Sequence, residues 1–365
     1  MYKRLKIRLY PTKQQEQVLQ QHADSYRFAY NLCLEYKKHL WDYHKKSVSG
    51  YDMQAELFVL AKEVDFLSAC KVECIRQAAL DVESTYQKFF KQKKGYPKFK
   101  SKKDKQSFTA NQSITVKNTI LSFFKQKIKF RTSEKYRTKL QNSKIKQCTF
   151  IKDKTNKWFA TCLIEDSEVK VFSKTENSVG VDLGLKHFLI TSDGEYISNN
   201  KFSIKKQYKL RKLQRKFAKT KKEGKNREKL RIKIAKLYQK ITNQREHFYH
   251  QVSNKLIREN QSITIETLKV ANMVKNRKLS KAISDVAWSN FTSMLEYKCN
   301  WYGRDLIKVP SNYASSKICS CCGNKKEDLK LLDRTYNCGS CGILLDRDFN
   351  AAMNLKQYRE KYPLI

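Results

Sequence analysis

The N-terminal part of the chain begins with the alternating hydrophobic pattern of a strand and then changes to the period of a helix. Tyr2–Leu9 alternates like a strand, and Thr12 with Gln15 forms a capping box that predicts a helix reaching about Tyr43. Its apolar positions recur at steps of four and three: Leu19, Ala23, Tyr26, Tyr30 and Cys33. This periodicity predicts one buried helix face.

Two more helices are predicted, over Gln54–Val64 and from about Lys71 to Lys91. The last has a continuous buried stripe: Val72, Ile75, Ala79, Val82, Tyr86 and Phe89. Arg76 and Gln77 lie off that stripe. Together the three segments predict a helical bundle.

From Ser107 to Glu165 the period changes to that of short strands. Turn residues such as Lys117-Asn118 separate the segments. The predicted strands are Ile114–Val116, Ile120–Phe124, Lys127–Phe130, Lys146–Ile151 and Trp158–Ile164. We expect a small barrel or meander, followed by a polar connection into a new domain.

The C-terminal half alternates buried strands with helices. Ser178–Gly184 is an apolar strand interrupted by Asp182, and a hairpin turning at Asp193-Gly194 follows. Later elements are a strand ending in Glu266, a helix around Ile283–Tyr302 and a strand over Leu306–Val309. Acids at the ends of two strands and at the start of a late helix are brought together by an RNase H-like fold.

Composition then narrows the class of protein. The chain has 76 Lys+Arg against 35 Asp+Glu, a net charge of +41, and 17 of those bases fall in residues 205–240 with only two acids. Thin apolar seams around a break at Gly224 predict a basic helical hairpin there. Such an excess of positive charge favours binding to a polyanion, and nucleic acid is the default partner. No apolar run approaches a membrane span, and no secretory segment is expected, so we predict a cytoplasmic protein with reduced thiols.

Four cysteines predict a metal centre. Cys319-x-x-Cys322 and Cys338-x-x-Cys341 are separated by 15 residues, the spacing of a structural zinc ribbon. A closed site of four thiolates has no open position for chemistry, so one structural zinc is expected. The adjacent Cys321 offers a second possibility for the second ligand, and the C-x-x-C spacing favours Cys322.

Carboxylates near the ribbon complete a second candidate site. A helix is predicted to begin in Asp346–Ala352, where Asp346 suits a capping or supporting role and Asp348 could face other acids. Together with Asp182 and Glu266, Asp348 makes a set of three candidate acids whose order along the chain is Asp, Glu, Asp. Clustered carboxylates select Mg²⁺, and two such ions about 3.5–4 Å apart support phosphodiester hydrolysis.

These motifs resemble those of the TnpB family, transposon-encoded RNA-guided nucleases related to type V CRISPR effectors. Val179–Lys186 and Ile265–Val270 resemble the first two RuvC motifs, and Asp346–Ala352 resembles the last. Further matches lie between and before them: Asn272-Met273, Trp288, Tyr297-Lys298, Trp301–Gly303, Val309-Pro310, Ser315, His250, Arg76–Ala78, Phe89-Phe90 and Pro97–Lys100. The resemblance covers essentially the whole chain.

The resemblance implies an α+β multidomain protein. It implies a β-barrel wedge domain (1–12 and 96–172), an inserted helical recognition bundle (13–95), an RuvC nuclease domain (173–314 and 343–365, with the basic hairpin 203–245) and a zinc ribbon (315–342). It also implies a guide RNA from the transposon end, a double-stranded DNA target with a short transposon-adjacent motif, and a nucleoid-associated, monomeric prokaryotic protein.

By motif position, the resemblance assigns catalysis and magnesium binding to Asp182, Glu266 and Asp348. The zinc ligands carry over as Cys319, Cys322, Cys338 and Cys341. Nucleic-acid contacts are expected at Arg76, Gln77, Lys212 and Arg215.

Three other classes remain as alternatives. A DDE transposase shares the RNase H-like core, but its acids come in the order Asp, Asp, Glu. An actin-like ATPase would carry Thr where this chain has Leu185-Lys186. A guided DNA-binding repressor derived from TnpB would have lost catalytic acids, and all three are present here.

Overall fold

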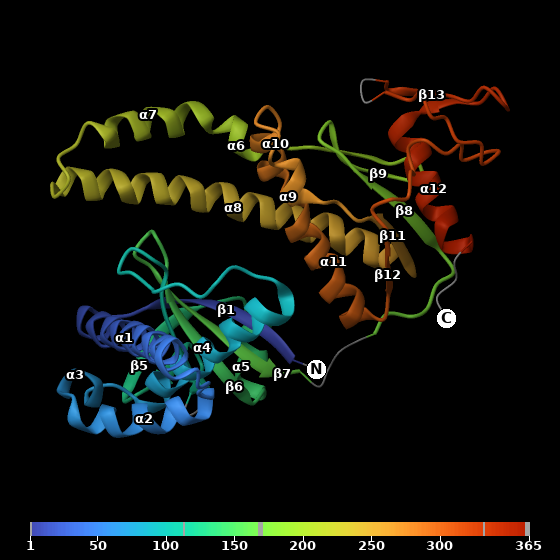
Figure 1. Ribbon diagram of the computed structural model, residues 1–365. Helices are drawn as coiled ribbons and strands as arrows, with labels where there is room; N and C mark the ends of the chain where they lie inside the picture. The colour runs from blue at the N-terminus through green and yellow to red at the C-terminus, as the bar shows by residue number, and fades with distance from the viewer. Residues whose placement is uncertain (1, 112–113, 167–170, 331–332, 362–365) are drawn as a thin grey trace. The chain divides into compact units, whose positions relative to one another are not determined.

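The computed structural model describes residues 2–111, 114–166, 171–330 and 333–361. The chain divides into two compact units, Met1–Glu168 and Val169–Ile365, whose elements are labelled in Figure 1. Each unit has its own hydrophobic core.

Helices of the first unit begin where the sequence places capping residues. Thr12 accepts a hydrogen bond from the Gln15 backbone and Gln15 returns one, and Ser49 with Asp52 forms a second box that the sequence analysis did not identify. The helices are α1 (Lys13–His44), α2 (Gly50–Glu63), α3 (Asp65–Ser68), α4 (Val72–Gln92) and α5 (Glu134–Asn142). The three predicted helices are confirmed, whereas the short α3 and the polar α5 were not predicted.

Strands of the first unit form one seven-stranded antiparallel sheet in the order β2-β6-β7-β1-β5-β4-β3. Their bounds are β1 (Tyr2–Tyr10), β2 (Gln106–Ala110), β3 (Thr115–Lys117), β4 (Ile120–Phe123), β5 (Gln126–Arg131), β6 (Ile145–Lys152) and β7 (Trp158–Glu165). β3, β4 and β5 make the expected meander, and β2 is an additional strand. Closure of the sheet into a barrel stays a prediction.

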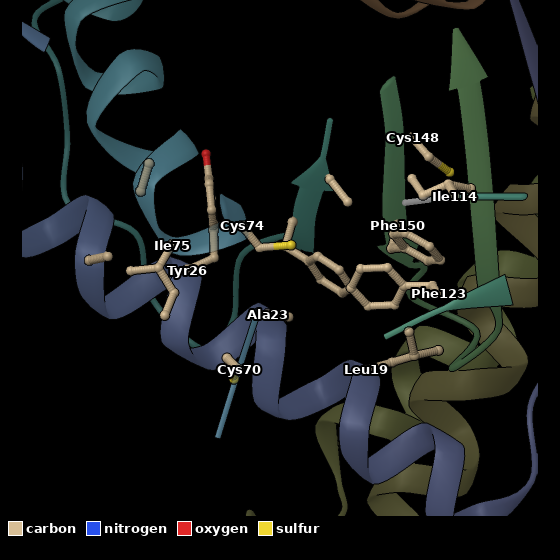
Figure 2. Packing of buried hydrophobic residues seen from close by; sticks show 14 of the residues in the cluster. Leu19, Ala23, Tyr26, Cys70, Cys74, Ile75, Ile114, Phe123, Cys148 and Phe150 are labelled. Atoms are coloured by element: carbon tan, nitrogen blue, oxygen red, sulfur yellow. The ribbon is translucent and has the colours of Figure 1, made fainter. Parts of the chain in front are cut away.

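The core of this unit lies between α1, α4 and the sheet. Figure 2 shows Leu19 and Ala23 of α1 and Cys74 of α4 beside sheet residues, among them Phe123 and Phe150. Phe150 stacks on the ring of Phe108 with centroids 4.9 Å apart. Burial of these aromatic rings is the main stabilising contribution here.

The second unit is built on a five-stranded sheet in the order β10-β9-β8-β11-β12. β8, β11 and β12 run parallel, and β9 and β10 run antiparallel to their neighbours. The bounds are β8 (Ser178–Leu183), β9 (His187–Thr191), β10 (Tyr196–Ser198), β11 (Ser262–Glu266) and β12 (Asp305–Val309). Every predicted strand of this half is present.

Helices of the second unit include the expected basic hairpin, whose second helix starts after Gly224 (Figure 1). The helices are α6 (Phe202–Lys205), α7 (Gln207–Ala218), α8 (Lys225–Glu259), α9 (Val270–Met273), α10 (Ser280–Val286), α11 (Trp288–Tyr302) and α12 (Arg347–Lys361). A two-stranded ribbon of β13 (Thr335–Asn337) and β14 (Leu344–Asp346) precedes α12. Among the described residues, no helix is both long and apolar enough to cross a membrane.

The single helix predicted over Ile283–Tyr302 is wrong in one respect, because it is interrupted at Ala287. Ala287 has a left-handed backbone with φ +46°, between α10 and α11. The residues before it are held elsewhere: Asp285 pairs with Arg245, and the Val286 carbonyl accepts from the Tyr249 hydroxyl. These tertiary bonds explain a break that no glycine or proline marks in the sequence.

Helix α12 packs against β8 with unusually little space, because β8 carries Gly180 at the contact. A Cβ atom on Gly180 would lie 2.1 Å from the Ala352 carbonyl oxygen and 2.4 Å from the Lys356 backbone nitrogen. Only glycine allows this approach. The middle of α12 is thereby held against β8, and Figure 1 shows this helix beside the sheet.

Candidate active site and metal centre

Two of the predicted acids lie at the carboxyl ends of neighbouring parallel strands. Asp182 is the penultimate residue of β8, and Glu266 is the last residue of β11. The register pairs Val181 with Ile265, so the two acids occupy the next position on each strand. Parallel pairing thus places both carboxylates at one edge of the sheet.

The electrostatics of these carboxyls reflect burial and mutual repulsion. Burial, then the neighbouring charges of Glu266 and Asp348, raise the pKa of Asp182 well above its ordinary value. Burial raises the pKa of Glu266 to about 7, with Asp348 adding to the effect and the Leu183 N–H opposing it. Without a cation, the site therefore resists full ionisation.

The third acid comes from the first turn of α12. Asp348 follows the start of that helix, and Asp346 caps it: one carboxylate oxygen of Asp346 accepts from the backbone N–H groups of Asp348 (3.0 Å) and Phe349 (3.1 Å). The capping role predicted for Asp346 is confirmed. Asp346 thus fixes the backbone that carries Asp348.

Two arginines contact the Asp348 carboxylate. Arg347 donates to it from Nη2 (2.8 Å) and Nε (3.1 Å), and Arg334 lies 3.9 Å away. Sequence reasoning gave neither arginine a role. Both place positive charge next to the acids, and the charge of Arg347 opposes the rise in the pKa of Asp182.

A close cluster of potential metal ligands is formed by cysteines. Among the described residues, the four thiols of Cys319, Cys322, Cys338 and Cys341 are the only group of three or more ligand atoms that all lie within 4.8 Å of one another.

The cysteine geometry fits a tetrahedral zinc ion. Sγ atoms of Cys319 and Cys341 are 3.6 Å apart, as are those of Cys322 and Cys338. Zn–S bonds of ~2.3 Å in a tetrahedron imply sulfur separations of about 3.8 Å. Cys322 belongs to this group and Cys321 lies outside it, which favours Cys322 as the second ligand.

Polar side chains of α12 attach the ribbon to the helix that carries Asp348. Asn350 accepts from the Ser320 N–H (2.9 Å) and donates to the Ile318 carbonyl (2.7 Å). Asn354 donates to the same carbonyl at 2.6 Å. Both asparagines are buried. The sequence analysis did not anticipate this role. The signal available in the sequence is the pair of asparagines four residues apart, on successive turns of the predicted helix.

The predicted nucleic-acid contacts fall in different environments. Lys212 and Arg215 are exposed on α7. Gln77 is only 9% exposed, binds Asp81, and accepts a hydrogen bond from Asn111. The expectation that Gln77 lies off the core stripe is therefore wrong, because its amide completes a polar network between α4 and the sheet.

Arg76 is half-buried, with its guanidinium 5.7 Å from the centre of the Phe58 ring. Its Nε is buried and has no hydrogen-bond partner in the part of the chain that the structure describes. The structure holds no nucleic acid, so contact between Arg76 and DNA stays a prediction.

Comparison with known proteins covers most of the chain. Family models match at residues 159–277 ("Probable transposase"), 288–355 ("Cas12f1-like, TNB domain") and 1–46 ("Helix-turn-helix domain"). A Streptomyces pristinaespiralis protein named "Putative RNA-guided DNA endonuclease" is 35% identical over 96% of this chain and 87% of its own length. The mimivirus protein "TnpB-like protein L79" is 32% identical over 50% of this chain and 37% of its own.

The chain belongs to the TnpB family. Its fold is Cas12f1-like: Cas12f1, solved in a complex with sgRNA and target DNA, covers 98% of both chains with a TM-score of 0.57 at 15% identity. The acids, the cysteines and the asparagines of α12 all lie in the part of this TnpB protein that matches the first two models.

Proposed function

We propose that this TnpB-family protein is an RNA-guided DNA endonuclease that hydrolyses phosphodiester bonds at Asp182, Glu266 and Asp348. The observation that carries the proposal is the convergence of these acids from β8, β11 and the first turn of α12, where burial and the charge of neighbouring acids raise the pKa values of Asp182 and Glu266. The strand order and directions support an RNase H-like, RuvC-type domain. The name of the Streptomyces relative supports the same activity.

The three carboxylates fit the oxygen-rich ligand set that Mg²⁺ requires. Two such ions, when bound, would activate a water and stabilise the leaving 3′-oxygen. The protein's own residues orient this site: Asp346 fixes the turn that carries Asp348, and Gly180 lets the middle of the same helix approach the sheet. Arg334, with a side chain 56% exposed, can contact a DNA phosphate from beside Asp348.

The four cysteines hold a structural zinc in this proposal. The hydrogen bonds of Asn350 and Asn354 join the ribbon to α12, so the zinc fold supports the position of Asp348 without touching the reacting atoms. The zinc centre therefore affects the cleavage rate indirectly, by holding the helix that carries Asp348 in position.

Nucleic-acid binding is assigned first to the α7–α8 hairpin. Few acidic residues accompany the lysines and arginines of this hairpin, and Lys212 and Arg215 are exposed there. We assign a guide RNA from the transposon end and double-stranded target DNA as partners. Residues 1–12 and 96–172 then form the wedge, 13–95 the recognition bundle, 173–314 and 343–365 the nuclease and 315–342 the ribbon.

The test separates chemistry from binding. Asp182→Asn, Glu266→Gln and Asp348→Asn should each reduce cutting of guide-matched DNA by more than about 100-fold, because losing a ligand exceeds the 10–100-fold cost of disturbing an outer-shell partner. Binding of the same DNA should stay within a few-fold of wild type. Asp193→Asn, which changes an acid whose side chain is 56% exposed, is the control. Wild-type protein that binds guide-matched DNA in Mg²⁺ without cutting it would overturn the proposal.

A further inference from the structure

A cavity of about 220 Å³ lies beside Glu266 in the second unit. Glu266 itself forms part of the wall, together with Leu183 at the end of β8. The cavity extends along one face of α11, where Ser289, Thr292 and Ser293 line it. It therefore begins at a proposed catalytic carboxylate and leads away from it.

The walls combine apolar and hydroxyl-bearing surfaces. Leu183, Leu268, Val270 and Trp288 supply the apolar part. Hydroxyls come from α11 and from Thr267, directly after Glu266. A flat ring with polar edges matches such walls better than an aliphatic chain or a bare phosphate would.

Trp288 forms a rigid part of the cavity wall. The residue lines the cavity but is only 2% exposed, so it shapes the wall and offers a ligand little of its ring surface. Its indole N–H is buried and has no hydrogen-bond partner among the described residues. The open surface for a ligand therefore comes from the leucines and the hydroxyl-bearing side chains.

The far side of the cavity is charged. Lys308 of β12 and Glu296 of α11 line it and form an ion pair with each other, and both side chains are about 40% exposed. An exposed pair of this type holds its partners weakly. Lys308 can therefore exchange Glu296 for a backbone phosphate at little cost.

We propose that this cavity binds one nucleobase of the DNA strand being cut, next to the scissile phosphate. The inference rests on the proposed nuclease function and adds a substrate subsite to it. The ring packs on Leu183 and Leu268 beside Trp288, the hydroxyls of α11 contact its edge, and Lys308 contacts a neighbouring phosphate.

The same walls predict little sequence preference. Hydroxyls on α11 rotate and can donate or accept, so they satisfy the edge of any base. Stacking is likewise sequence-tolerant, since every base has a π-face. The subsite orients the strand at Glu266 without reading its sequence.

The first experiment scans the wild-type protein, purified with its RNA, on guide-matched DNA carrying a single abasic nucleotide at successive positions around the cut. One position should slow cleavage by roughly 5- to 100-fold, the worth of one base's stacking contacts. Uniform rates at all positions would overturn the proposal.

The second experiment fills the cavity. Thr292→Phe should cleave intact DNA slowly. Its cleavage rate should recover on DNA that is abasic at the sensitive position, where the missing base leaves room for the new ring. Asn290→Phe is the control, because Asn290 is exposed on the same helix and does not line the cavity. Equal loss on intact and abasic DNA would count against the subsite.

A fluorescence measurement needs neither cutting nor a guide. A short oligothymidylate with one 2-aminopurine should lose emission on binding wild type or Asp182→Asn, as the base packs against the cavity walls, and should keep it with Thr292→Phe. Quenching by all three proteins, or by none, would refute the subsite. Quenching by wild type without any cutting of guide-matched DNA would instead keep the subsite and remove the nuclease assignment.

Discussion

Replacing Gly180 with alanine tests how closely the site depends on the packing of α12. The added Cβ would sit 2.1 Å from the Ala352 carbonyl oxygen and 2.4 Å from the Lys356 nitrogen. Both are backbone atoms of a helix, so no side chain can rotate away. Restoring ordinary contact requires a displacement of roughly 1 Å between α12 and β8, against the tight packing of protein interiors.

That displacement has two calculable consequences. Overpacking of this kind costs about 1–3 kcal/mol, which lowers Tm by roughly 2–12 °C for a unit of this size. Asp348 travels with α12, whereas Asp182 stays on β8. Because a misplacement of about 1 Å can cost 100-fold in rate, cleavage should fall by about that factor while DNA binding is kept.

The assay pairs thermal unfolding followed by circular dichroism with single-turnover cleavage at a temperature where the variant is folded. Gly95→Ala is the matched control, because a Cβ there meets nothing within 4 Å. Wild-type Tm in Gly180→Ala would refute the close approach. Lowered Tm with wild-type cleavage would refute the coupling of helix position to the carboxylates.

Periodicity predicted most elements of this chain because the strands and helices that build the cores bury regular faces. The α1 helix and its capping box were correct to within a residue or two. Two of the acids were located from strand ends and the third from the start of a helix. The polar α5 was missed because its one buried residue, Leu140, leaves almost no periodic signal. Short-range pattern is informative only where a face is buried.

Contacts between distant segments were beyond the sequence analysis. Nothing local at Gly180 indicates that α12 packs on it, and nothing near Arg334 indicates that it lies 3.9 Å from Asp348. Gln77 was misplaced for the same reason, since its partner Asn111 comes from another element. The C-x-x-C spacing favoured Cys322 over Cys321, and the grouping of the four Sγ atoms agrees with that choice.

Three further predictions address the metal centre, the cap and the wedge. Cys338→Ser should release zinc, measured by mass spectrometry of the native protein, whereas Cys321→Ser should retain one ion per chain; equal zinc in both would exclude Cys338 as a ligand. Asp346→Ala should cost ~0.5–2 kcal/mol in urea unfolding, because two N–H groups of α12 lose their acceptor; an unchanged midpoint would refute the cap. The last concerns pH. Burial alone would raise the pKa of Asp166, but hydrogen bonds from Lys139 and Lys3 lower it to about 2. A carboxyl with a depressed folded-state pKa stabilises the fold above its unfolded value near 4 and loses that contribution as pH falls towards 2. Asp166→Asn should therefore destabilise the first unit by about 1–2 kcal/mol at pH 7 and by much less near pH 2. Unfolding curves of both proteins across this range measure the difference, and a gap that stays constant with pH would show that the ion pairs do not carry it.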